Sequence, residues 1–130
     1  MMMITETQEQ QKLVQWLKLK KLFHFAPINE NQGSFTNRRV AVIQAVKAKS
    51  MGKAKGISDI IVMLPNKILF IELKRAKKIL KSGKLSTSHT KVSEEQKEFL
   101  QHIVDNFAYA DAMVCYGFDE AREFIECHLK

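Results

Sequence analysis

The stretch GISDIIVMLPNKILFIELKRAK, residues 56–77, carries two acids and a lysine among apolar residues. Asp59 opens the first apolar run, and Glu72 lies near the end of the second, two residues before Lys74. Paired carboxylates are the hard oxygen ligands that Mg²⁺ or Mn²⁺ prefers, and such an ion can bind a phosphate oxygen and lower the pKa of a bound water. A lysine beside them can orient that water or neutralise charge on the phosphate. This chemistry requires a fold that brings the three side chains together.

The two apolar runs predict strands over 59–64 and 67–74 that form a hairpin around Pro65. A loop of two or of four residues gives the same register, in which Asp59 faces Glu72 with Cβ atoms roughly 5 Å apart. We expect the four-residue loop, because Pro65 disfavours the tight primed turns.

Like charges directly opposite each other destabilise a sheet, so the acid pair makes sense if a divalent cation lies between the carboxylates. Lys74 shares the face of Glu72, because side chains alternate along a strand. The alternative is that both acids are ordinary strand-end residues that face solvent, since an E-x-K triplet alone is a weak motif. The matched register, the lysine and the lack of any other acid in the surrounding basic segment favour a metal site.

Positive charge is concentrated in the middle of this 130-residue chain, whose formal net charge is +7. Residues 38–84 carry thirteen Lys or Arg and two acids, a net +11, whereas the remainder carries a net −4. A basic middle between acidic ends is typical of a surface that binds a polyanion such as DNA, although a solvated basic surface has the same composition. The candidate DNA contacts are Lys53, Lys55, Arg75, Lys77, Lys78, Lys81 and Lys84.

The elements that must position these residues alternate between helix and strand, which predicts an α/β fold. Thr5 is the expected N-cap of the first helix, and Ser93 with Gln96 has the spacing of a capping box at the start of the third. Periodicity predicts helices over 5–21, 35–51, 93–107 and 119–129, and further short strands within 22–30 and 112–117.

Two basic segments have separate expected environments. In the helix over 35–51 we expect Val42, Ile43 and Val46 to face the core and the basic residues to face solvent. Residues 76–92 are basic and rich in Gly, Ser and Thr, and we expect most of them to form a mobile surface loop.

The sequence contains no stretch that approaches the ~18 apolar residues of a membrane span, so no membrane partner is expected. The beginning of the chain, MMMITETQEQ, lacks the layout of a signal peptide. Cys115 and Cys127 fall on an expected strand and an expected helix without metal-type spacing. We therefore expect two reduced core thiols in a cytoplasmic protein.

The ordered set of motifs resembles the virus-type replication–repair nuclease (VRR-NUC) family of the PD-(D/E)XK nuclease superfamily. That family combines an N-terminal helix with Glu and Gln, G-x-x-D before one strand, (I/V)-E-x-K on the next, and S-x-x-Q at the start of a helix. Here these motifs read ETQEQ, GISD, IELK and SEEQ, and the similarity runs from residue 6 to about 129. The superfamily's proline before the aspartate is Ser58 here, a minor departure because the Gly56-to-Asp59 context is kept.

The resemblance implies a restriction-endonuclease-like core, a mixed β-sheet flanked by helices, in a single domain over 1–130. It implies Mg²⁺ or Mn²⁺ as cofactor, with Asp59, Glu72 and the backbone carbonyl of Leu73 as metal ligands. It also implies that Lys74 is the catalytic lysine.

The resemblance further implies that Glu6 of the first helix reaches the metal site. Glu9 is its rival, but Glu6 fits the family's spacing better because Gln10 then lies one turn along. A favourable charge in the first helical turn would also explain Glu6. Gln96 is a weaker site candidate, since its capping-box role is an adequate explanation.

The expected activity is a DNA endonuclease of replication, recombination or repair, in a bacterial or phage-infected cell, that acts on branched or junction DNA. One active site per chain cuts two strands most simply as a symmetric homodimer. Two rivals remain: a non-catalytic nucleic-acid-binding module, and a sequence-specific restriction enzyme of the same fold, for which the chain leaves little room. Metal-dependent cleavage separates the nuclease from the binding module.

Overall fold

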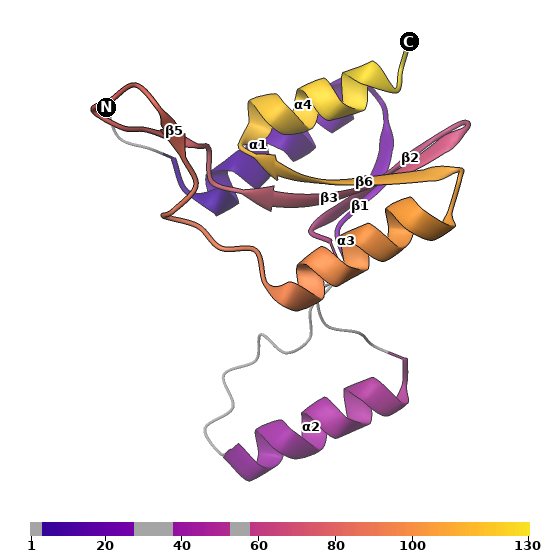
Figure 1. The fold of residues 1–130 in the computed structure, drawn as a ribbon. Coiled ribbons are helices and arrows are strands. Elements are labelled where there is room, and N and C mark those ends of the chain that lie inside the picture. The colour runs from indigo at the N-terminus through magenta and orange to yellow at the C-terminus, as the bar shows by residue number, and fades with distance from the viewer. Residues whose placement is uncertain (1–3, 28–37, 53–57) are drawn as a thin grey trace.

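A mixed four-stranded sheet is the centre of the computed structural model, which describes residues 4–27, 38–52 and 58–130. Its elements are strands β1 (Phe23–Phe25), β2 (Ile60–Leu64), β3 (Lys67–Lys74) and β6 (Ala110–Tyr116), and helices α1 (Glu6–Leu19), α3 (Glu94–Asn106) and α4 (Phe118–Cys127). The strand order is β1-β2-β3-β6, antiparallel through β3 and parallel between β3 and β6. Helices α1 and α4 cover one face, and α3 lies on the other (Figure 1). The expected α/β fold with a mixed sheet flanked by helices is confirmed.

The first helix begins where the sequence indicates. The Thr5 hydroxyl accepts a hydrogen bond from the Gln8 backbone N–H, and the Gln8 side chain accepts one from the Thr5 N–H, so the two form a capping box. Leu13 and Leu17 of this helix are fully buried. These contacts fix α1 against the sheet with its N-terminal acids at one end.

The β2–β3 hairpin has the expected register, which ends with Leu64 opposite Lys67. Only Pro65 and Asn66 connect the strands, so the loop has two residues and not the four that we expected. Neither residue has a positive φ. The two-residue turn is therefore not of the primed type that Pro65 disfavours, and the expected register is kept.

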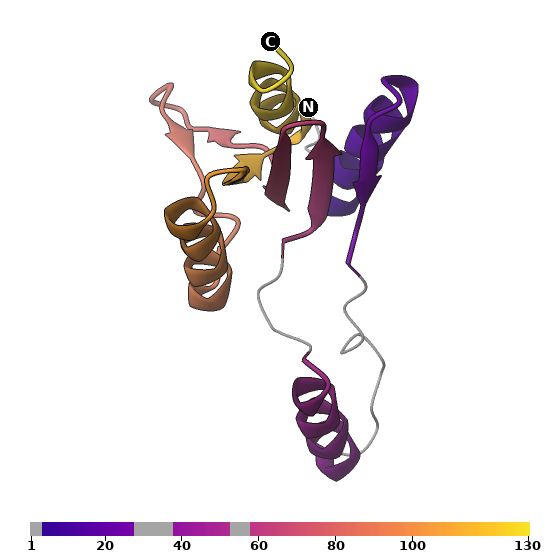
Figure 2. The ribbon, with the colours of Figure 1, turned by 90° about the vertical axis from the view of Figure 1, so that its right-hand side faces the viewer.

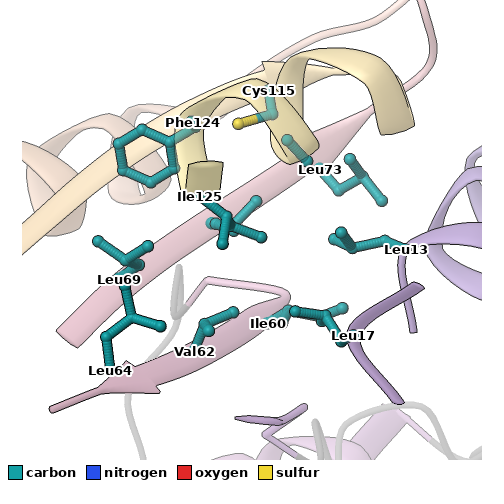
Figure 3. Close-up of a cluster of buried hydrophobic side chains, with 12 residues drawn as sticks. Leu13, Leu17, Ile60, Val62, Leu64, Leu69, Leu73, Cys115, Phe124 and Ile125 are labelled. Atoms are coloured by element: carbon teal, nitrogen blue, oxygen red, sulfur yellow. The ribbon is translucent and has the colours of Figure 1, made fainter. Parts of the chain in front are cut away.

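The hydrophobic core fills the space between the sheet and the layer of α1 and α4 (Figure 3). It consists of Leu13, Leu17, Ile60, Val62, Leu64, Leu69, Ile71, Leu73, Cys115, Ala121, Phe124 and Ile125. Because alternate residues of a strand share a face, the odd-numbered residues of β3 enter this core. Its even-numbered residues belong to the other face, where Phe70 contacts Phe99 of α3 with ring centroids 5.8 Å apart. Glu72 is on the α3 side of the sheet for the same reason.

A second hairpin occupies part of the segment that we expected to be a mobile loop. Strands β4 (Lys78–Ile79) and β5 (Leu85–Ser86) pair with Ile79 opposite Leu85. Gly83 makes the turn with φ +84, and its N–H donates to the Leu80 carbonyl at 2.9 Å. The sequence did not reveal this hairpin, because two-residue strands are too short to show a period of two; the rest of the segment is irregular.

Helix α2 (Arg38–Ser50) forms within its expected range, but it stands apart from the rest of the fold, beyond the α3 side of the sheet (Figures 1 and 2). None of its residues is buried. Val42, Ile43 and Val46, which we expected in the core, are exposed. Periodicity marks an apolar face of a helix, but it does not say which surface covers that face.

The two cysteines are both unpaired but have different environments. Cys115 is in the core, and burial raises the pKa of its thiol to about 12. Cys127 is exposed, and its Sγ donates to the Phe124 carbonyl at 2.9 Å. The expectation of two core thiols was therefore wrong for Cys127, which lies on the outer side of α4.

In the part of the chain that the structure describes, no helix has the length and apolar character needed to cross a membrane.

Candidate active site

The β2–β3 hairpin brings Asp59 and Glu72 to the same end of the sheet. Asp59 directly precedes β2, and the register that pairs Ile60 with Ile71 places it beside Glu72. Asp59 is half-buried, and its Oδ2 accepts a hydrogen bond from the backbone N–H of Leu73 at 2.8 Å. This bond crosses from one strand to the other and fixes the Asp59 carboxylate at the strand end.

Glu72 is buried, with 1% of its surface exposed. Its Oε1 accepts a hydrogen bond from Gln96 Nε2 and lies 3.9 Å from Lys74 Nζ. Its Oε2 is also buried and has no hydrogen-bond partner among the described residues. A buried carboxylate oxygen without a donor is unfavourable. Such an oxygen is expected where a protein leaves a ligand position for a cation.

The surroundings of the acid pair favour a bound proton when no cation is present. Burial and the charge of Asp59 together raise the pKa of Glu72 to about 8, although Lys74 opposes the shift. Burial also raises the pKa of Asp59, against the effect of the hydrogen bond from Leu73. The two carboxylates interact, so they titrate as a pair. At neutral pH the pair holds a proton that a cation would displace.

Gln96 is both a helix cap and a contact of the site. Its Oε1 accepts from the Ser93 backbone N–H at 2.8 Å, and the Ser93 hydroxyl accepts from the Gln96 N–H at 3.1 Å. Its Nε2 meanwhile donates to Glu72. The sequence presented these two roles as alternatives, but an amide has a separate acceptor and donor and can fill both.

Glu6 and Glu9, the two rival acids of α1, have different surroundings. Burial raises the pKa of Glu6, while Lys74 lowers it and Asp59 raises it, so the Glu6 carboxylate is within electrostatic range of the acid pair. Glu9 is 4% exposed, and its Oε2 accepts a hydrogen bond from the Phe118 backbone N–H at 3.2 Å. Glu6 is thus the acid that approaches the site, and Glu9 binds the start of α4.

The role of Glu9 was missed from the sequence. The N-cap residue of α4 is Gly117, which has φ +93 and offers no side chain to cap the helix. A Cβ at Gly117 would lie 2.6 Å from Glu9 Oε2 and 3.0 Å from Ala76 Cβ. The Gly117 N–H also donates to the Lys74 carbonyl at 2.8 Å, so this crowded contact adjoins the site. A glycine before an acidic helix start was the only signal, and it does not reveal a partner 109 residues away.

The predicted DNA contacts do not share one environment. Lys53 and Lys55 lie outside the described residues. Three others are exposed on the β4–β5 hairpin: Lys78, Lys81 and Lys84. These three are available to a polyanion.

The other two predicted DNA contacts are half-buried. Lys77 is half-buried, with its Nζ 3.3 Å from Glu120 Oε2 and 5.5 Å from the centre of the Tyr116 ring. Arg75 is half-buried as well. The geometry therefore favours a structural role for Lys77 beside any contact with DNA.

The residues at the acid pair fit a hard divalent cation. Asp59 and Glu72 supply the carboxylate oxygens that Mg²⁺ and Mn²⁺ prefer, and Oε2 of Glu72 has no competing donor. Over the described ranges, no three or more His, Cys, Asp or Glu side chains form a group that could hold a metal ion, so Glu6 does not join the pair in a three-carboxylate cluster. A cation that keeps several waters, as Mg²⁺ does, needs few protein ligands.

The order of these motifs and the geometry they produce agree with a sequence model of the VRR-NUC domain, which matches residues 4–119. This chain belongs to the VRR-NUC domain family. The matched range includes every site residue discussed above, from Glu6 to Gln96. The VRR-NUC domain is a nuclease-type domain, and such a domain implies binding of nucleic acid.

The fold has a counterpart among solved structures. A chain described as a VRR_NUC domain protein superimposes with a TM-score of 0.63 and 20% sequence identity, over 99% of this chain and 91% of that chain. At this identity the likeness establishes the fold alone. A search of curated proteins gave no match.

Proposed function

We propose that this VRR-NUC domain is a Mg²⁺- or Mn²⁺-dependent endonuclease that hydrolyses phosphodiester bonds in DNA. The observation that carries the proposal is the buried acid pair. Oε2 of Glu72 accepts no hydrogen bond from an N–H or hydroxyl group of the described residues, and the neighbouring charge of Asp59 raises the pKa of Glu72. Acids with a purely structural role are solvated or fully bonded when buried. In the pair of Asp59 and Glu72, by contrast, Oε2 of Glu72 remains as an oxygen ligand for a cation.

The site residues have distinct proposed roles. Asp59, Glu72 and the backbone carbonyl of Leu73 would hold the cation, which supplies a Lewis acid that activates water and offsets charge on the phosphate. Lys74, next to Glu72, neutralises the charge that develops on the phosphate in the transition state. Gln96 holds Glu72 in position through its hydrogen bond to Oε1.

Glu6 has a supporting role in this proposal. The charges of Asp59 and Lys74 act on its carboxylate, but among the described residues it does not form a three-carboxylate group with Asp59 and Glu72. From that position it adds negative charge to the cation site and orients water there. The helix that carries it is fixed by the Thr5 capping box and by Leu13 and Leu17 in the core.

The proposed substrate is branched or junction DNA in replication, recombination or repair. The exposed lysines of the β4–β5 hairpin follow Lys74 closely in the chain and would bind the phosphate backbone. Two strands are cut most simply by a symmetric homodimer with one site per chain. Both cysteines are unpaired, which supports a reducing compartment such as the cytoplasm.

The test is a panel of end-labelled linear, flapped and four-way DNA, incubated with and without Mn²⁺. We expect cleavage only with metal, and faster cleavage of the branched DNA. Binding of all three DNAs without cleavage would instead indicate a non-catalytic module. A preference for one base sequence over branch structure would indicate a restriction-type enzyme.

Asp59→Asn provides the matched control for the metal site. The asparagine side-chain oxygen can still accept from Leu73, and the repulsion from Glu72 is removed. With a chelator, the variant should melt at the same or a higher temperature than wild type. Wild type should gain about 2.7 kcal/mol at a hundredfold excess of Mn²⁺ over its Kd, and the variant should lose most of this gain together with cleavage. An equal response to Mn²⁺ would contradict the metal site.

A further inference from the structure

Helix α2 has an apolar face that nothing in the described structure covers. Val42, Ile43 and Val46 are three or four residues apart, so they lie on one side of the helix. They are 55%, 57% and 64% exposed. An isolated helix of 13 residues is marginal in water, and β-branched residues make it weaker. This helix therefore needs a surface on which to pack.

The sheet has an uncovered apolar surface of its own. Phe23 and Phe25 of the edge strand β1 and Met63 of β2 are 66%, 44% and 42% exposed. Phe23 pairs with Met63, and the rings of Phe23 and Phe25 are 6.4 Å apart, so the three form one patch on one face. Contiguous exposed apolar residues of this kind mark an interface.

This patch lies on the α3 side of the sheet but beyond the reach of α3. The face is set by register: Phe25 pairs with Ile61, and Ile61 pairs with Phe70, which contacts α3 through Phe99. The close contacts of α3 with the sheet are with β6, at the opposite edge from β1. In the part of the chain that the structure describes, α3 thus covers this face over β6, and no helix covers it over β1 and β2.

We propose that α2 of each chain packs on the β1–β2 patch of a second copy, in a symmetric dimer with exchanged helices. A helix with an apolar stripe is the usual cover of such a sheet face. The chain's own α2 stands away from its own patch (Figure 2). Each chain therefore offers one helix and one acceptor surface. In a two-fold dimer, the helix of each chain covers the patch of its partner, so the assembly is closed and has two equivalent contacts.

The exchange supplies the interface of the dimer proposed above and so rests on that proposal. Two helix–sheet contacts contribute to the ~1,200–2,000 Å² that a stable interface buries. A 13-residue helix is about 20 Å long, enough to cross the short strands β1 and β2.

The exchanged helix would also change the active site. Asp59, Ile61 and Met63 are alternate residues on one face of the hairpin, so the patch and the acid pair share that face, with the buried Ile61 between them. Within α2 there are four basic residues and no acid: Arg38, Arg39, Lys47 and Lys49. The partner's helix would therefore add positive charge beside the carboxylates, where a DNA phosphate must approach.

The first test measures mass in solution by light scattering, without DNA or metal, so its outcome does not depend on nuclease activity. Wild type should elute as a dimer of two 15.0 kDa chains. The helix variant Val42→Glu/Val46→Glu and the sheet variant Phe23→Lys/Met63→Lys should each be monomers with circular dichroism close to that of wild type. Val104→Glu is the control, an exposed helical valine of α3 outside both surfaces, and it should remain dimeric.

A second measurement distinguishes exchange from other modes of packing. In a Cys127→Ser background, an affinity-tagged chain with Val46→Cys is mixed with an untagged chain with Met63→Cys and then oxidised. Exchange predicts a disulfide between the tagged and untagged chains. The proposal is overturned if wild type is monomeric, if the sheet variant remains dimeric, if no mixed disulfide forms, or if a chain that carries both cysteines closes them internally at high dilution.

Discussion

Gln96 donates a hydrogen bond from its Nε2 to Oε1 of Glu72 while its own Oε1 accepts one from the backbone N–H of Ser93. One side chain thereby connects the first turn of α3 to the acid pair of the sheet. The capping box fixes the amide, so Oε1 of Glu72 is engaged by Gln96, and Oε2 is the oxygen without a hydrogen-bond partner among the described residues. The two roles of Gln96 can be separated by mutation.

Gln96→Glu should retain the helix cap and damage the site. A glutamate at this position also completes a capping box, but it presents a carboxylate to Glu72 in place of a donor. We expect cleavage to fall about 10- to 100-fold, as for other residues that orient a metal ligand. Ser93→Ala should do the opposite, with a loss of about 1 kcal/mol in the free energy of unfolding and near-normal cleavage. Equal effects of both variants on cleavage would show that only the cap matters.

Lys74→Ala tests the proposed electrostatic role of the lysine. Cleavage in single-turnover assays should fall about 10²- to 10³-fold, the usual effect of removing one stabilising group from a transition state. Binding of DNA and Mn²⁺ should be retained, because in this proposal other residues bind the DNA backbone and the metal ion. Lys67→Ala is the control, because Lys67 is at the other end of the same strand, where its Nζ donates to the Ala108 carbonyl. Near-normal single-turnover cleavage by Lys74→Ala would reject the role.

The metal-free protein should lose stability as the pH rises. The pKa of Glu72 is raised from 4.5 to about 8, so folding favours its protonated form. The stabilisation is fully present below about pH 4.5 and is lost as the pH rises through about 8. Thermal melts with a chelator should therefore show a falling melting temperature between pH 5 and pH 8.5 (the interval set by these pKa values), and Glu72→Gln should flatten it.

Metal binding should have the opposite dependence on pH. The cation needs both carboxylates deprotonated, so it displaces the shared proton and binds more tightly as the pH rises over the same interval. Calorimetric titrations of Mn²⁺ in two buffers of different ionisation enthalpy would detect the released proton. If the melting temperature of Glu72→Gln had the same pH dependence as that of wild type, a group other than Glu72 would be responsible for it.

The β4–β5 hairpin should determine the salt dependence of DNA binding. Replacing Lys78, Lys81 and Lys84 with Gln should weaken binding to every DNA and reduce the slope of log Kd against log salt by about 0.9 for each phosphate that the hairpin no longer neutralises. Lys18→Gln, an exposed lysine in the last turn of α1, is the control and should leave the slope unchanged. A triple variant with the wild-type slope would mean that the hairpin does not touch the backbone of the DNA.

The sequence predicted the parts of the site that depend on local pattern and register. Two strands and a short turn permit only one alignment of their apolar faces, so the proximity of Asp59 and Glu72 followed from the order of residues. The capping boxes at Thr5 and Ser93 were predictable for the same reason, since a helix start uses neighbours three residues apart. All of these interactions connect residues that are close in the chain or paired by a tight turn.

The misses concern contacts between distant segments. The apolar stripe of α2 was recognised, but an apolar stripe does not identify the surface that covers it. Glu9 was weighed only as a metal ligand, because its partner at Phe118 is fixed by the packing of α1 against α4 and not by a motif. The exposure of Cys127 depends in the same way on how α4 is rotated against the sheet.

Gly117→Ala tests whether the Glu9 cap and the site are coupled through one crowded contact. Gly83→Ala is a matched control, because Gly83 has a similar φ of +84 but no atom within 4 Å of its would-be Cβ. The control should lose only the strain of a left-handed alanine, roughly 1–2 kcal/mol in the free energy of urea unfolding. Gly117→Ala should lose more, since Oε2 of Glu9 must move away from the Phe118 N–H.

The excess loss in Gly117→Ala should depend on Glu9. In a Glu9→Ala background the crowding with Oε2 is gone, so the additional cost of Gly117→Ala should shrink toward that of Gly83→Ala, with a remainder from the close approach to Ala76. The Gly117 N–H bonds the Lys74 carbonyl, so Gly117→Ala should also slow cleavage, whereas Gly83→Ala should not. Additive costs in the double-mutant cycle would show that Glu9 and Gly117 act independently, and that α4 is fixed to the end of β3 by other contacts.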